Sequence, residues 1–166
     1  MRFSLLRVLL LIPSALTAGC AVNLSAPQSA TQSAPERDLV EYFRSPGSGL
    51  PFSPAVQVGD VVYLSGQIGA TADGQIPAGI EAQARAAMDN LKASARLAGV
   101  TMDDMFKCLV MLDDMSQWGE FNKVYVTYFK PERLPARSAF GADGLALGAT
   151  LEVECMAVAP RKAGAR

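Results

Sequence analysis

The fold is decided by a stretch in the middle of the chain, Phe106-Lys107-Cys108-Leu109-Val110-Met111-Leu112. Successive side chains of a strand point to opposite faces of its sheet, and here both faces are largely apolar. This pattern is typical of a central strand that is covered on both sides. It therefore predicts a sheet with a cover on each face.

Helical patterns lie on both sides of this strand. From Ile80 to Ala98, small and apolar residues recur at helical spacing, and Gly99 is a suitable end. After the strand, Asp114 or Ser116 can cap a second helix. We interpret the stripe on that helix as core rather than as a stacking platform: Trp118, Phe121, Val124, Tyr125 and Tyr128.

Further strands complete the sheet. Val56–Val58 and Val61–Ser65 form a predicted hairpin around Gly59-Asp60, and Arg137–Phe140 and Ala149–Val158 follow the second helix. The order β-β-α-β-α-β-β predicts an α+β fold, a mixed β-sheet with two helices packed on one face. No residues remain for a second helical layer, so we expect another subunit to cover the other face.

Composition narrows the possible functions. The chain has 166 residues, 50% of them apolar, which suffices for one domain with a packed core. It contains no histidine, which excludes Ser-His-Asp and Cys-His catalysis and histidine-bearing zinc sites. The formal net charge of −1 shows no basic excess, so we expect no nucleic-acid partner.

The N-terminus predicts export. Residues 1–19 combine a basic start with a short apolar run interrupted by Pro13, which indicates a signal peptide. Leu16-Thr17-Ala18-Gly19-Cys20 resembles a bacterial lipobox, so we expect cleavage before Cys20 and lipidation of its side chain. An ordinary cleaved signal and an uncleaved anchor are the alternatives.

The rest of the chain is divided accordingly. Residues 20–38 are poor in large apolar side chains and predict a lipid-anchored flexible linker, followed by the domain 39–160 and a tail, 161–166. The lipid on Cys20 would hold the protein in a membrane, and Ala21 favours the periplasmic side of the outer membrane. A soluble periplasmic or secreted protein is the alternative. Loss of residues 1–19 would leave a net charge of −3.

Two charged groups are candidates for chemistry. Glu152 and Glu154 point the same way from the last strand. They are either a solvated strand end that forms salt bridges, or part of a cleft in which one glutamate acts as a general base or holds a water molecule. Arg137 follows Leu134-Pro135-Ala136 and can bind a carboxylate through two hydrogen bonds, or pair with one of the glutamates. The segment Ser65–Gly69 allows close backbone approach to a ligand, or is only a turn.

Two strand cysteines, Cys108 and Cys155, are expected to be buried thiols. Export permits a disulfide between them as the alternative, provided that their Cα atoms lie within about 7 Å.

In order and spacing, five segments resemble the Rid family of reactive-intermediate deaminases, the RidA/YjgF proteins also labelled L-PSP endoribonucleases. The resemblance covers Ser45 to Pro160. Its motifs are Leu64–Gly69, Val100–Asp114, Asn122–Phe129, Leu134–Ser138 and Leu151–Val158. It implies a chorismate-mutase-like fold and a homotrimer whose sheets form a barrel, with sites in the clefts between subunits.

The resemblance also implies roles for residues. Arg137 matches the arginine that binds the substrate carboxylate, and Glu152 the glutamate that positions the attacking water. The other implied substrate-binding positions are Ser65, Asn122, Ala139 and Phe52. Phe52 stands where many members have tyrosine, and Ala139 where several have cysteine, although its backbone could still contact the substrate nitrogen.

The implied reaction is hydrolysis of small 2-imino acids to 2-keto acids and ammonia, without metal or cofactor. The alternative is a non-catalytic envelope lipoprotein that binds small carboxylate ligands in clefts between subunits. RNA cleavage, which the older family label suggests, is disfavoured by the missing histidine and by the negative charge of the processed chain.

Overall fold

A computed structural model describes residues 39–44, 47 and 49–160 of the chain. All of them belong to the unit Arg37–Arg166. The predicted signal peptide, the lipidation site Cys20, the linker 20–38 and the tail 161–166 lie outside the described residues and remain predictions.

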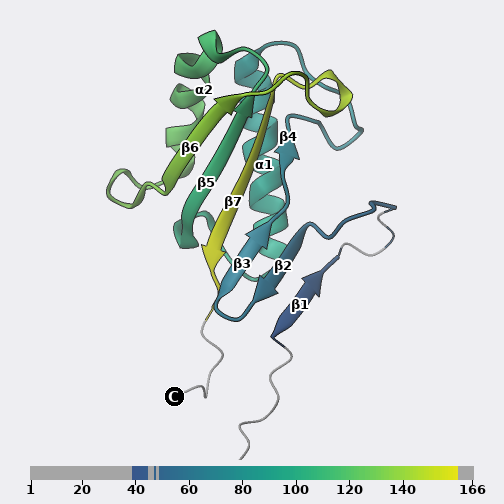
Figure 1. Ribbon diagram of the computed structural model, residues 1–166, viewed down its shortest axis with the longest axis vertical. Helices are drawn as coiled ribbons and strands as arrows, with labels where there is room; N and C mark the ends of the chain where they lie inside the picture. The colour runs from purple at the N-terminus through teal and green to yellow at the C-terminus, as the bar shows by residue number, and fades with distance from the viewer. Residues whose placement is uncertain (1–38, 45–46, 48, 161–166) are drawn as a thin grey trace, which may run out of the picture. The chain divides into compact units, whose positions relative to one another are not determined.

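One mixed sheet forms the centre of the described chain (Figure 1). Its strands are β1 (Val40–Phe43), β2 (Ala55–Val58), β3 (Val61–Leu64), β4 (Gln67–Ile68), β5 (Met105–Leu112), β6 (Ala136–Gly141) and β7 (Leu151–Val158). They run in the order β1-β2-β3-β7-β5-β6, and β4 also pairs with β7. Only β5 and β6 are parallel, so the sheet is mixed, as the sequence predicts.

The prediction that Phe106–Leu112 forms a central strand is confirmed by β5. β5 lies between β6 and β7, and the hairpin of β2 and β3 turns at Gly59-Asp60, with Val58 opposite Val61. Gly59 has a φ of 58°, in the left-handed region that glycine adopts without strain. Two strands were not predicted, because the side chains of β1 are mostly exposed and β4 has only two residues.

Two helices cover one face of this sheet (Figure 1). They are α1 (Ile80–Leu97) and α2 (Trp118–Tyr125). Among the described residues there are also five 3₁₀ turns: η1 (Met102–Asp104), η2 (Met115–Gln117), η3 (Val126–Tyr128), η4 (Pro131–Arg133) and η5 (Ala146–Gly148). The second predicted helix is therefore divided into η2, α2 and η3, and the Asp114 carboxylate caps η2 by accepting the Ser116 N–H.

Small side chains allow α1 to pack closely on the sheet. Ala84, Ala87 and Ala95 are fully buried, and a Cβ at Gly69 would lie 2.5 Å from the Gln83 backbone oxygen. The buried Gln83 side chain accepts the Thr150 N–H at 2.8 Å, which joins α1 to the start of β7.

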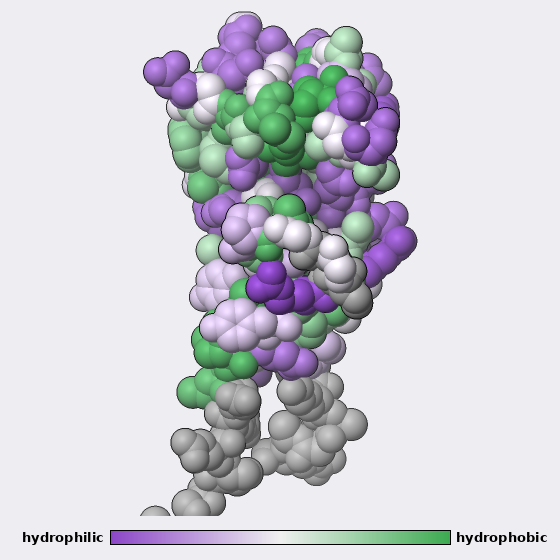
Figure 2. Space-filling model, turned by 90° about the vertical axis from the view of Figure 1, so that its right-hand side faces the viewer, coloured by the Kyte–Doolittle hydropathy of each residue, from purple (hydrophilic) through white to green (hydrophobic). Residues whose placement is uncertain are grey.

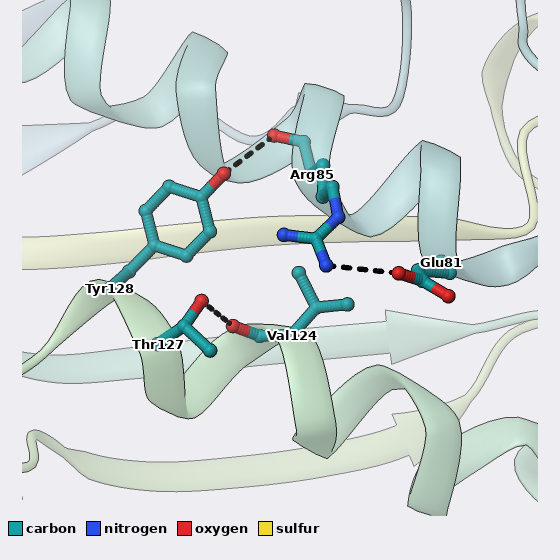
Figure 3. A network of polar contacts seen from close by, with 5 residues as sticks. All are labelled: Glu81, Arg85, Val124, Thr127 and Tyr128. Carbon is teal, nitrogen blue, oxygen red and sulfur yellow. Dashed lines mark hydrogen bonds and ion pairs between the residues drawn. The ribbon is translucent and has the colours of Figure 1, made fainter.

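Polar contacts join α1 to the segment after α2 (Figure 3). The Tyr128 hydroxyl donates to the Arg85 carbonyl at 3.2 Å, and the Arg85 guanidinium pairs with Glu81 one turn earlier. Tyr128 also contacts the Asp89 carboxylate at 3.0 Å. The two helices thus form one layer over the sheet.

The prediction of free thiols at Cys108 and Cys155 is wrong. These residues face each other in the register of β5 and β7, with Cα atoms 4.1 Å apart, and form a disulfide. The register could not be derived from the spacing of 47 residues alone, and it brings the two side chains within bonding distance.

The opposite face of the sheet has no helix over it in the described chain (Figure 1). Lys107, Leu109 and Met111 on β5 are half-buried on this face, and Tyr63 on β3 is 45% exposed. We call it the open face. Its cover by another subunit remains a prediction. Among the described helices, none combines the length and apolarity that crossing a bilayer requires.

Candidate functional site

The two leading candidates, Arg137 and Glu152, lie on opposite faces of the sheet. Arg137 on β6 is beside Cys108, whose side chain is buried on the helix-covered face. Glu152 on β7 is opposite Met111, whose side chain belongs to the open face. An ion pair between Arg137 and either glutamate of the same chain, one of the sequence alternatives, is therefore not formed.

Arg137 is held by aromatic rings of α2. Its Cζ lies 4.4 Å from the ring centroids of both Trp118 and Tyr125, and 5.9 Å from that of Phe121. Burial lowers the pKa of the Arg137 guanidinium below its usual value, while arginine remains charged in proteins. Within the described residues it forms no ion pair, so its positive charge has no protein counter-charge.

Three buried polar atoms of α2 and β6 have no hydrogen-bond partner within the described chain: Arg137 Nη1, Asn122 Oδ1 and the Tyr125 hydroxyl. Burial raises the pKa of Tyr125 to about 12, so its hydroxyl keeps its proton at neutral pH. A buried polar atom without a partner costs about 1–3 kcal/mol. Their grouping indicates a polar site that a ligand or another chain completes.

Ala139 extends this group along β6. It lies two residues beyond Arg137 on the same face, beside Val110, and packs partly against the core. The helix-covered side of the sheet thus brings together three predicted positions, Asn122, Arg137 and Ala139. We call them the arginine cluster.

The other three predicted positions share a pocket of about 810 Å³. Phe52, Ser65 and Glu152 all line it, together with residues of β4 and α1. The Ser65 hydroxyl donates to the Ser53 carbonyl at 2.7 Å, which ties the end of β3 to the loop that carries Phe52. We call this group the glutamate pocket.

Apolar side chains border the glutamate pocket. Phe52 and Leu147, both of which line it, are 45% and 74% exposed. Figure 2 shows the side of the molecule that lies to the right in Figure 1, where apolar surface gathers in the upper part. On the α1 side, the Asn90 amide donates to the carbonyls of Ile68 and Ala70 and so fixes the segment around β4.

Glu152 is a half-buried carboxylate without an ion pair to any described residue. Burial, and secondly the nearby charge of Glu154, raise the pKa of Glu152. A Cβ at Gly66 would overlap Glu152 Oε1, so the carboxylate lies directly against the Gly66 backbone. Glycine at this position allows the approach of the carboxylate, and no positive φ angle is involved.

The sequence interpretation of the aromatic stripe was correct but incomplete. Phe121 and Tyr125 are buried core residues, as expected. Trp118 and Tyr125 also contact Arg137, which the helical spacing alone did not reveal, because it does not say which strand lies under α2. The described residues contain no group of three or more side chains suited to hold a metal ion.

Comparison with known proteins gives a consistent result. The family model described as endoribonuclease L-PSP matches residues 44–159. A mouse protein named 2-iminobutanoate/2-iminopropanoate deaminase is 36% identical over 124 residues, which are 74% of this chain and 91% of the mouse protein.

Solved structures agree with this match. Yeast Mmf1 aligns with a TM-score of 0.67 at 31% identity, over 73% of this chain and 99% of Mmf1. Escherichia coli TdcF with bound serine aligns with a TM-score of 0.63 at 32% identity, over 74% of this chain and 98% of TdcF.

Proposed function

The chain belongs to the endoribonuclease L-PSP family. We propose that it hydrolyses 2-imino acids to 2-keto acids and ammonia. Relatives from mouse, rat and human that are 32–36% identical over most of the chain carry the name of this activity. The observation that carries the proposal is Arg137, a guanidinium held among aromatic rings with Nη1 unpaired.

The guanidinium binds the substrate carboxylate. Its planar fork can donate two parallel hydrogen bonds, and the low-dielectric aromatic surroundings strengthen the attraction. The relative TdcF was crystallised with serine, which also carries an α-carboxylate, and this supports a small carboxylate as the ligand class. Asn122, the third polar member of α2 and β6 in this region, offers a further hydrogen-bonding atom within the arginine cluster.

Glu152 positions the water. A carboxylate whose pKa is raised by burial is a suitable general base near neutral pH. It accepts a proton as water adds to C2 of the C=N bond. Glu152 then gives this proton to the nitrogen, which yields a carbinolamine. Transfer of the hydroxyl proton to the same nitrogen releases ammonia, and C2 becomes the keto carbon. Because imines are electrophilic, correct positioning supplies much of the rate.

The proposed site is composite. Arg137 and Glu152 lie on opposite faces of one sheet, so a substrate that contacts both needs them from two chains. We propose a ring of three subunits in which the arginine cluster of one subunit meets the glutamate pocket of its neighbour. The open face, with its half-buried apolar side chains, would supply the contact surface.

We also propose that the protein works outside the cytoplasm, anchored through a lipid on Cys20. The disulfide between Cys108 and Cys155 supports the location outside the cytoplasm, because structural disulfides persist in oxidising compartments and are rare in the cytosol. A mass spectrum of protein extracted from membranes tests the anchor. A processed chain with an unmodified Cys20 would exclude it.

The activity is tested with 2-iminopropanoate generated in situ by an amino-acid oxidase. Wild-type protein should accelerate decay of the imine, and Arg137→Ala and Glu152→Gln should each abolish most of that acceleration while staying folded. If wild-type protein gives no acceleration over buffer, hydrolysis of this substrate is refuted.

The alternative function, carboxylate binding without catalysis, is favoured by the same unpaired atoms of the arginine cluster. It predicts that 2-oxobutanoate binds to wild-type protein and not to Arg137→Ala, while imines decay no faster than in buffer. Calorimetry and the decay assay together distinguish the two functions.

A further inference from the structure

We propose that Trp118 and Tyr125 are positioning residues for Arg137. Together with Phe121 they form what we call the aromatic cage, which fixes the guanidinium and leaves its charge available to a substrate carboxylate. This inference rests on the proposed role of Arg137 and adds how the protein holds that side chain.

The geometry of the cage is specific. The Arg137 Cζ is equally close, at 4.4 Å, to the ring centroids of Trp118 and Tyr125. These residues are seven positions apart, which is two turns of helix, so both lie on the side of α2 that faces β6. The cage thus depends on one helix and one strand edge.

The aromatic cage orients Arg137 without neutralising its charge. A carboxylate partner would orient the guanidinium equally well but would neutralise it and occupy its N–H groups. Ring faces attract the cation and accept none of its in-plane hydrogen bonds. In agreement, Nη1 is buried and unpaired, and no described carboxylate forms an ion pair with Arg137.

The ring of Tyr125, rather than its hydroxyl, carries the positioning role. The hydroxyl has no hydrogen-bond partner within the described chain, whereas the ring contacts the guanidinium. Tyr125→Phe should therefore retain positioning, while Tyr125→Leu should lose it. Trp118→Phe and Trp118→Leu make the same comparison at position 118. Because Trp118 is only partly buried, Trp118→Leu should disturb the core less than Tyr125→Leu.

Phe129 supplies a matched control. Its ring continues the same stripe, 4.8 Å from the Tyr125 ring, and it is 8% exposed. It makes no cation–π contact with Arg137 within the described structure. Phe129→Leu should thus lower stability through lost packing without changing substrate affinity.

Steady-state kinetics of the full-length protein with 2-iminopropanoate test the proposal. We expect Trp118→Leu and Tyr125→Leu to raise KM about 5- to 30-fold, the range for a desolvated cation–π contact, with a smaller change in kcat. Trp118→Phe and Tyr125→Phe should restore most of the affinity. An unchanged KM in both leucine variants, or an equal rise in Phe129→Leu, overturns the proposal.

Side-chain NMR gives a second measurement, which should not change if Trp118 and Tyr125 only pack in the core. With ¹⁵N-labelled arginine, slow rotation about the Arg137 Nε–Cζ bond should become fast in Trp118→Leu and stay slow in Phe129→Leu. Arg137→Ala separates the two proposals. If wild-type protein itself is inactive, the proposed function fails; if Arg137→Ala keeps wild-type activity, the role of Arg137 fails and the cage with it. If Arg137→Ala is inactive while both leucine variants match wild type, only the cage fails.

Discussion

Arg137 and Glu152 are two ionisable side chains in different partly buried surroundings. Arg137 is surrounded by rings and has no counter-charge within the described chain, so its positive charge can act on a ligand. Glu152 is half-buried beside another carboxylate, which favours its protonated form more than water would. Burying each of these groups without an opposite charge beside it costs some stability.

Gly66→Ala tests the close contact between backbone and carboxylate. The added methyl group would overlap Glu152 Oε1 and force the carboxylate away. We expect kcat for 2-iminopropanoate to fall by about 10²-fold or more, as for a misplaced catalytic group. Gly119→Ala, at an exposed position of α2 where an added Cβ meets no atom within 4 Å, is the control for expression and folding. Full activity in Gly66→Ala would contradict the assigned position of Glu152.

Glu154→Gln tests the electrostatic coupling between the two glutamates. Burial and Glu154 both raise the pKa of Glu152, and the substitution removes the second cause. If ionised Glu152 is the base, activity is lost as the pH falls through its pKa. Lowering that pKa should shift the acid limb of the kcat/KM profile to lower pH. A shift to higher pH, or none, would show that Glu154 does not act on Glu152.

At the scale of elements, β7 connects both parts of the proposed site. Its Glu152 lines the glutamate pocket, while its Cys155 is bonded to Cys108, the neighbour of Arg137 on β6. The residues Cys155, Cys108 and Arg137 thus lie side by side across three strands. The disulfide thus links β5 and β7 directly beside Arg137, on the same face of the sheet.

Reduction of this disulfide should destabilise the domain. A bridge between residues 47 positions apart constrains the unfolded chain, and its loss typically costs about 2–4 kcal/mol. Unfolding in guanidinium chloride, with and without reductant, measures the change. The double variant Cys108→Ala/Cys155→Ala is the control, because its midpoint should not respond to reductant. An equal response in both proteins would mean that the bridge is not formed.

At the scale of the whole molecule, Arg137 and Glu152 point to opposite faces of the sheet. In the described chain, the open face leaves apolar strand surface without a helix. A ring of subunits explains both features, because each contact repeats around a closed axis and joins two different surfaces.

Mixed oligomers test this arrangement. Co-refolding inactive Arg137→Ala with inactive Glu152→Gln in equal amounts should restore about a quarter of wild-type activity, since mixed three-membered rings contain one intact interface. The double variant Arg137→Ala/Glu152→Gln, co-refolded with wild type, controls for the dilution of subunits. No recovery from a mixture shown to exchange subunits would refute a site shared between chains.

Local patterns in the sequence were sufficient for most elements of the fold. The apolar run of β5, the spacing of α1, the Gly59-Asp60 turn and the length of β7 each depend on neighbouring residues alone. The same holds for the shared face of Glu152 and Glu154. The short strands β1 and β4 were missed because their pairing, rather than their own pattern, makes them strands.

Residue types and the family resemblance were enough to name Arg137 and Glu152 as candidates for chemistry. How the candidate residues are grouped in space followed from the tertiary structure. Strand register placed Cys155 opposite Cys108 and put Arg137 and Glu152 on opposite faces, and the packing of α2 over β6 brought Trp118 and Tyr125 to the guanidinium. The physical reason is that register and packing arise from contacts between residues far apart in the chain, which no local periodicity encodes.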